Sequence, residues 1–142
     1  MSEVKQKVLD VIAANQPLVA ALATVGEDGR PRVRYVVPHV ADDLTMTVAT
    51  WRESRKVADV GAHPEVHLTC GSTNMEAPGN YLQIEARAEV STNADKKRAH
   101  WSDGLSSYFA GPEDPNYALL IITPYRITVH GMTTMEADVW EA

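Results

Sequence analysis

Short apolar segments, many of them rich in β-branched residues, recur along the chain between turns that contain Gly, Pro or Asp. Near the N-terminus, Val4, Val8 and Val11 recur at helical spacing, which predicts a helix over residues 3–15 that Pro17 ends. The segments "LVAALATV" and "RPRVRYVVPHV" flank the turn "GEDG". This arrangement predicts a β-hairpin.

Further strands are expected at "LTMTVAT", "EVHLTCG", "YLQIEARAEVS" and "YALLIITPYRITVHG", the last read as two strands bent at Pro124. Two more helices are expected. "SRKVADVGAH" carries Gly61 near its C-terminus and Pro64 just beyond. "ADKKRAHWSDGL" follows Thr92, which with Asp95 resembles a capping pair. About six strands with short connections predict a mainly β (α+β) fold, an antiparallel barrel with short flanking helices. The acidic tail after residue 131 stays unassigned.

Length and composition favour one compact domain spanning residues 1–142. A single cysteine, Cys70, rules out an internal disulfide framework and suits a reducing compartment. The charged N-terminal segment has no apolar region typical of a signal peptide, and no apolar run approaches about 18 residues. We therefore expect a soluble cytoplasmic protein with no membrane partner.

Charge is unevenly distributed along the chain. The formal net charge is −6, yet residues 30–56 contain six basic and three acidic residues. A nucleic-acid-binding protein needs a wider basic face than this, so no nucleic-acid partner is expected. The pattern favours one small positive site that binds a small anion.

The segment "TWRESRK" carries this positive charge at the start of a predicted helix. Ser54 is placed to cap that helix, and its first-turn N–H groups together with the helix dipole favour an anion. Arg55 and Lys56 are unfavourable beside a positive dipole end unless an anion lies there. The alternative is a solvated basic turn, because exposed Lys and Arg are common.

Other catalytic patterns are weak or absent. His63 and His67 have metal-ligand spacing, but Pro64 lies between them in a predicted strand, so no metal site is expected. "GLSSYFAG" does not match G-x-S-x-G, and neither a G-x-G-x-x-G loop nor a P-loop occurs. Cys70 lies among apolar strand residues and is expected to be buried and inert. No residue is assigned as a general acid or base.

Taken in order, "ALATVGEDGRPRVRYVV", "TWRESRKVADVGAHPEVHLTC", "YLQIEARAEV" and "FAGPEDPNYALLIITPYRITVHG" resemble the FMN-binding split barrels related to pyridoxamine-phosphate oxidase. The resemblance covers nearly the whole chain and is greatest to the general-stress-protein branch. It implies a six-stranded antiparallel split β-barrel that forms a homodimer, with FMN bound at the interface.

The resemblance also implies roles for individual residues. Arg34 would face the phosphate or ribityl chain, with Tyr35, Val36 and Val37 beside the ring. Thr50 would touch FMN, and the S-R-K motif of Ser54, Arg55 and Lys56 would hold its phosphate. Tyr81 and His130 would reach the flavin ring from the second subunit. Trp101 and Phe109 lie in a segment expected beside the pocket. The implied cofactor-binding set is Arg34, Tyr35, Val36, Val37, Thr50, Ser54, Arg55, Lys56, Tyr81 and His130.

Two departures from the oxidases limit the expected activity. Nothing basic follows Arg126, where the oxidases keep a motif that grips the substrate phosphate, and His39 replaces a lysine. We therefore expect flavin-dependent redox chemistry on an unidentified small molecule, not pyridoxamine-phosphate oxidation. The alternatives are a flavin carrier or redox sensor, a protein that uses deazaflavin or FAD, and a barrel that has lost its cofactor.

Overall fold

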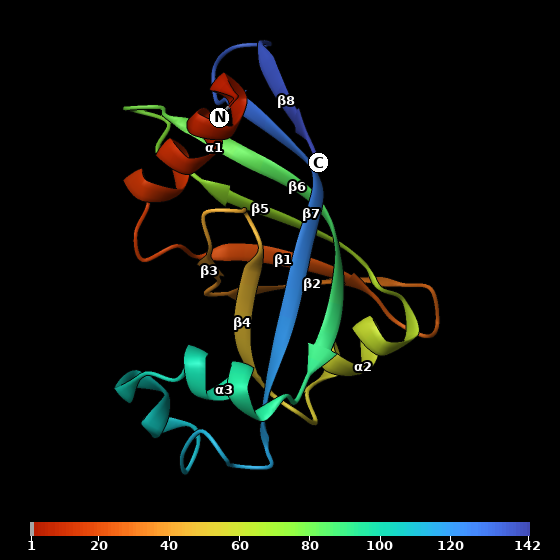
Figure 1. Cartoon of the computed structure of the whole chain (residues 1–142). Helices are drawn as coiled ribbons and strands as arrows, with labels where there is room; N and C mark the ends of the chain where they lie inside the picture. Colours follow the sequence, from red (N-terminus) through yellow and green to blue (C-terminus); the bar gives the residue numbers. More distant parts are fainter. Residues whose placement is uncertain (1) are drawn as a thin grey trace.

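The computed structural model describes residues 2–142 and shows a curved antiparallel sheet with helices outside it (Figure 1). Eight strands and three α-helices occur within these residues, with one 3₁₀ helix, η1. The elements in chain order are α1 (Glu3–Ala14), β1 (Ala20–Val25), β2 (Pro31–Val36), β3 (His39–Val40), β4 (Met46–Trp51), α2 (Arg55–Ala62), β5 (Glu65–Gly71), β6 (Asn80–Ser91), α3 (Ala94–His100), η1 (Asp103–Ser107), β7 (Tyr117–Gly131) and β8 (Ala137–Glu141).

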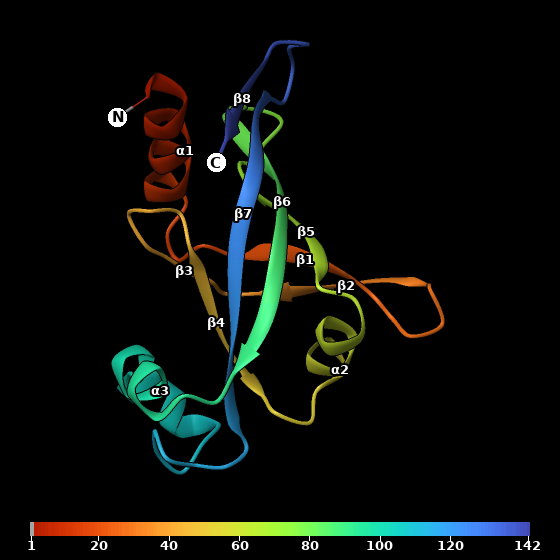
Figure 2. The same ribbon diagram turned by 45° about the vertical axis from the view of Figure 1, so that its right-hand side comes forward.

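The strands pair in the order β2-β1-β5-β6-β7-β4-β3, and β8 pairs with β7. β7 has two halves with different neighbours: its first half pairs with β4 and its second half with β8, while β6 runs along nearly its whole length. As a result β1, β2 and β5 cross the direction of β4 and β7, and the sheet curls into a half-barrel (Figures 1 and 2).

The predicted mainly β architecture is confirmed, but the predicted count of six strands is too low. β3 has only two residues, and β8 lies in the acidic tail that the pattern left unassigned. The bend at Pro124 does not divide β7, because Pro124 lies opposite Ala86 where the register with β6 shifts. A proline at such an irregularity costs no regular ladder hydrogen bond.

Apolar residues at every second strand position build the main core. β5 shows the alternation clearly, with Val66, Leu68 and Cys70 buried and the intervening residues exposed. The core continues through β6, β7 and α1, so the expected burial of Cys70 is confirmed. A second, smaller cluster lies apart from it and is built from Phe109, Tyr117 and Leu119.

Helix boundaries follow capping chemistry, with two corrections. Ser2 caps α1 by accepting a hydrogen bond from the Lys5 N–H at 3.0 Å. Asn93 caps α3, accepting from the Lys96 N–H, in place of the expected Thr92. The predicted helix over residues 94–105 is divided, since α3 ends at His100 and η1 follows.

α2 and α3 lie at the same end of β4, and α1 lies at the opposite end of the molecule (Figure 2). None of the helices within residues 2–142 combines the length and the apolar character needed to cross a membrane.

Candidate functional site

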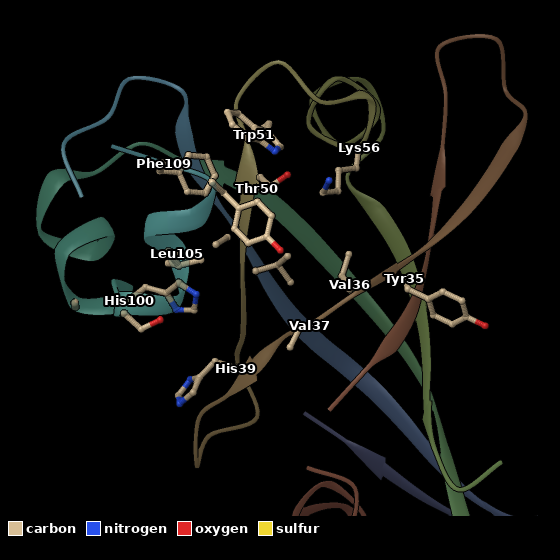
Figure 3. Close-up of a pocket in the computed structure, with 15 residues that line it drawn as sticks. Tyr35, Val36, Val37, His39, Thr50, Trp51, Lys56, His100, Leu105 and Phe109 are labelled. Atoms are coloured by element: carbon tan, nitrogen blue, oxygen red, sulfur yellow. The ribbon is translucent and has the colours of Figure 1, made fainter. Parts of the chain in front are cut away.

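A cleft of about 630 Å³ lies between the end of β2, β4 and the α3–η1 segment (Figure 3). Its walls are mainly apolar and aromatic, and within the described residues neither Asp nor Glu lines it. The lining residues are Tyr35, Val36, Val37, His39, Val48, Ala49, Thr50, Trp51, Lys56, Ala99, His100, Ser102, Leu105, Tyr108 and Phe109.

Lys56 lies at one end of this cleft, near Thr50 (Figure 3). Burial lowers the pKa of Lys56 below its ordinary value, and the nearby charge of Arg34 lowers it further. Lys56 is half-buried and lies near a second cation, and both effects disfavour its charged form. A bound anion would offset both effects. This end of the cleft is therefore a positive site in an acidic chain.

The start of α2 supplies further polar groups to the same end. The Thr50 hydroxyl is buried at the end of β4 and lies 3.2 Å from the Ser54 hydroxyl, to which it is hydrogen-bonded. Ser54 occupies the N-cap position, but its side chain makes no capping hydrogen bond, so the expected cap is absent. The first-turn N–H groups of α2 are thus without the acceptor that a capping side chain supplies.

Arg55 and Arg34 contribute less directly than the sequence suggests. Arg55 is exposed and does not line the cleft. The Arg34 guanidinium turns behind the cleft wall, where it donates to the Thr24 hydroxyl at 2.6 Å and the Leu22 carbonyl at 3.2 Å. It also lies 3.5 Å from the carboxylate of the buried Asp59. Arg34 and Arg55 therefore do not line the cleft, whereas Thr50 and Lys56 do.

Tyr35, Val36 and Val37 form one wall of the cleft, as the resemblance implies. Strand alternation buries Val36 and turns Tyr35 and Val37 outward. Tyr35 is 80% exposed and its ring points away from the other labelled side chains (Figure 3). This wall is therefore open on its outer side.

Tyr81 and His130 lie outside the cleft of their own chain. They are opposite each other on β6 and β7, with ring centroids 5.1 Å apart, and the His130 ring is hydrogen-bonded to Gln83. Tyr81 borders a separate hollow of about 410 Å³ that also involves Cys70 and reaches Tyr35. The cleft and this second hollow thus share Tyr35, which lies on the outward face of β2.

The end of the cleft away from Lys56 holds two histidines (Figure 3). The rings of His39 and His100 are 6.3 Å apart. Burial lowers the pKa of His100, and the neighbouring His39 lowers it further. His100 was not predicted from the sequence, because it reaches the cleft only through the packing of α3 against β7.

Phe109 lines the cleft and packs on Trp51 with ring centroids 4.8 Å apart, whereas Trp101 lies behind it against Tyr117. His63 and His67 are exposed, and residues 2–142 contain no group of three or more metal-ligating side chains. Arg126 is paired with Glu85 and Glu141 on the outer surface.

The model of the pyridoxamine 5'-phosphate oxidase family matches residues 4–131, which is most of the chain. The chain belongs to this family.

Within the family, the chain is 34% identical over 125 residues to general stress protein 26 of Bacillus subtilis, covering 88% of this chain and 86% of the relative. The crystal structure of general stress protein 26 from Bacillus anthracis superposes with a TM-score of 0.81 at 26% identity, covering 99% of this chain and all of that one.

Two further family members differ more. A pyridoxamine 5'-phosphate oxidase-related, FMN-binding protein of Nostoc punctiforme has a TM-score of 0.75 at 15% identity, covering all of this chain and 97% of the other. The pyridoxine/pyridoxamine 5'-phosphate oxidase of Burkholderia lata is 35% identical over 92 residues, 65% of this chain. The match spans 42% of that oxidase, less than half its length.

Proposed function

We propose that the cleft binds FMN, with the phosphate beside Lys56 and the ring along the wall formed by Tyr35, Val36 and Val37. Lys56 carries this proposal, because it is the one Lys or Arg that lines the cleft within the described residues, and no carboxylate lining the cleft opposes it. A ligand with one anionic end and one flat, largely apolar end suits such a cleft.

The groups at the positive end fit a phosphate. Lys56 supplies an ammonium, Thr50 and Ser54 supply hydroxyls, and the first turn of α2 supplies N–H donors. Arg34 adds its charge from behind the wall, and Arg55 adds its charge from the surface. When bound, FMN would supply electron or hydride transfer, which none of these side chains provides.

A second copy of the chain would close the open wall. Apolar side chains on the outward face of β2 and just after it are unusually exposed, at 69% for Val33 and 61% for Val37. A contiguous apolar surface of this kind is typical of a protein interface. In a homodimer formed over this face, Tyr81 and His130 of the partner subunit would lie against the ring, as the resemblance implies.

The activity proposed is flavin-dependent redox chemistry on a small molecule. The aromatic and apolar residues of the cleft would exclude water from the ring, and the two histidines would line the end away from the phosphate. The chain would bind and orient the flavin, and no residue is assigned to proton transfer.

Mass spectrometry of the small molecule that co-purifies with the protein tests the cofactor. We expect the mass of FMN and a flavin absorbance spectrum. A deazaflavin, FAD or haem in its place would contradict the assignment of FMN. Reduction of the bound flavin by NADH or NADPH, followed by reoxidation with candidate acceptors, then separates an enzyme from a carrier.

A further inference from the structure

A further hollow adjoins the cleft at its histidine end, between α3 and the strands β4 and β7, and none of the proposed roles uses it. This α3 hollow has a volume of about 360 Å³ and is lined by His39, Thr45, Thr47, Lys96, Ala99, His100, Leu119 and Ile121. His39, Ala99 and His100 also line the cleft, so the two spaces meet at the histidine pair.

The floor of the α3 hollow comes from β4 and β7. Thr47 is directly opposite Ile121 in the register of the two strands. Strand alternation turns Thr45, just before β4, and Thr47 away from the main core, to which the buried Met46 belongs. Leu119 and Ile121 are part of the second, smaller core cluster. The floor is therefore apolar, with two threonine hydroxyls beside it.

One side of α3 covers this floor. Lys96, Ala99 and His100 are spaced three and four residues apart, so they lie on the same side of the helix. His100 is the last residue of α3 and meets His39 of β3, with ring centroids 6.3 Å apart. The two imidazoles therefore mark the passage between the α3 hollow and the cleft.

Lys96 gives the α3 hollow its charge. Within the described residues it is the one Lys or Arg that lines the hollow, and no Asp or Glu among them lines it. The next cations along α3 are engaged, since Arg98 pairs with Asp95 and Lys97 donates to the Asp114 carbonyl. None of the salt bridges within residues 2–142 involves Lys96. Its ammonium is therefore free to pair with a ligand.

Together these groups suit a carboxylate on an apolar body. An ammonium and two hydroxyls can donate to the two oxygens of a carboxylate, and Leu119 and Ile121 offer apolar contact. A lone lysine is a single point charge, whereas phosphate sites commonly add a helix N-terminus or the fork of an arginine. The α3 hollow therefore favours a monoanion over a phosphate dianion.

We propose that the α3 hollow binds the carboxylate end of the redox substrate, held by Lys96, while the other end of the substrate passes His39 and His100 into the cleft. The substrate class is then a small carboxylic acid with an apolar body. This inference rests on the proposed function, because it names the class of molecule on which the flavin would act. Lys96 contributes binding, and no electron or proton transfer is assigned to it.

NMR titrations with hexanoate and with its uncharged amide, hexanamide, test the site, since NMR suits the weak binding of so small a ligand. In the wild-type protein, hexanoate should shift the imidazole resonances of His39 and His100 and leave those of the exposed His63 and His67 unchanged. Lys96→Gln removes a charge-assisted hydrogen bond, so the affinity for hexanoate should fall about tenfold and that for hexanamide should change less than about twofold. An equal loss of both ligands, or no loss of either, would overturn the role of Lys96.

Arg30→Gln is the matched control. Arg30 is exposed in the turn between β1 and β2 and lines neither the cleft nor the α3 hollow. Its substitution changes the net charge of the protein by the same amount as Lys96→Gln, and the affinity for hexanoate should stay within about twofold of wild type. A loss as large as that in Lys96→Gln would mean that overall charge, and not the α3 hollow, holds the ligand.

The dependence on pH gives a second readout. Burial lowers the pKa of His100, and the neighbouring His39 lowers it further, so this imidazole gains its proton only in acid. The titratable groups that share its surroundings are His39, Lys96, and Tyr108 and Lys56 in the cleft, and no carboxylate of the described residues lines either space. Hexanoate should therefore bind about threefold more tightly near pH 5.5 than near pH 7.5, and His100→Gln should remove most of this difference. An affinity that is the same at both pH values in the wild-type protein would contradict a carboxylate site beside His100.

Titration with FMN separates the two proposals. Lys56 lines the cleft and Lys96 lines the α3 hollow, so saturating FMN should leave the affinity for hexanoate within about twofold of its value in flavin-free protein. Displacement of hexanoate by FMN would overturn the inference, because it would place the carboxylate at the positive end of the cleft. Wild-type protein that binds hexanoate through Lys96 but binds no FMN would contradict the proposed function.

Discussion

The two faces of β2 reverse the usual distribution of residues on a strand. The face toward α2 carries Arg32 and Arg34, which are half-buried and paired with Asp59. The outward face carries Val33 and Tyr35, which are largely exposed. Buried charge and exposed apolar surface are both costly in isolation, so each face indicates a function that folding alone does not explain. The inner face lies beside the anion site that we propose, and the outer face is the one that we propose a second copy of the chain covers.

The largest effect is expected from placing charge on the outer face. In the proposed dimer, Val33→Lys combined with Val37→Lys buries like charges against each other, and we expect the dimer to dissociate at least about a hundredfold more readily. Sedimentation at micromolar concentration measures this. Val139→Lys, at an exposed position on β8, is the control and should leave the oligomeric state unchanged. A wild-type monomer that binds FMN tightly would contradict the shared site.

Removing the cation that lines the cleft should have the next largest effect. Lys56→Gln deletes one charge-assisted hydrogen bond, so FMN affinity should fall about tenfold or more, with a much smaller change for riboflavin. Fluorescence titration with both ligands gives the comparison. Arg52→Gln, at an exposed residue outside the cleft, should leave both affinities unchanged. An equal loss of both ligands in Lys56→Gln would mean that the phosphate lies elsewhere.

A smaller effect is expected on stability, and its dependence on pH has a definite sign. The folded state lowers the pKa of Lys56 from 10.5, so the charged lysine disfavours folding at neutral pH. Lys56→Met should raise Tm by about 1–3 °C at pH 7. The gain should shrink as the pH rises through the folded pKa and past 10.5, above which the lysine is largely neutral in both states. Thermal unfolding at several pH values checks this, and a gain that grows with pH would refute it.

The last expectation is that the protein does not oxidise pyridoxamine phosphate. Lys56 is assigned to the cofactor, Arg34 is bound to Asp59, and Arg126 is paired with Glu85 and Glu141. The FMN-loaded protein should therefore not oxidise pyridoxamine phosphate at a useful rate, since no free cation lining the cleft in residues 2–142 remains for a second phosphate. Formation of pyridoxal phosphate in air is the assay. Sustained turnover at micromolar substrate would show that other residues hold the substrate.

Local patterns in the sequence predicted the features that depend on neighbours in the chain. The alternation in β5, the helix before Pro17 and the burial of Cys70 all follow from such patterns. The segment "RPRVRYVVPHV" was predicted as one strand, whereas the structure divides it into β2 and the two-residue β3. β8 was missed because its acidic segment lacks a clear apolar alternation and pairs with β7 alone.

The candidate site likewise contains residues that a local motif predicted and residues that it did not. Thr50 and Lys56 were predicted from one continuous motif, and both line the cleft. The capping role of Ser54 was wrong, because its hydroxyl bonds to Thr50. Asp59 was not predicted, because its partners lie on β1 and β2, far from it in the sequence. His100 was not predicted either, because it reaches the cleft only where α3 packs against β7.

The second core has a consequence for how a ligand enters. Residues 94–116, which supply His100, Leu105 and Phe109 to the cleft, pack on a small aromatic cluster apart from the main core. The buried Lys97 ties this segment together by donating to the Asp114 carbonyl. A segment that packs outside the main core can open at a lower free energy than the whole molecule. Amide hydrogens in this segment should therefore exchange before those of β6 and β7, and the proposed ligand could enter or leave the cleft while the sheet stays folded.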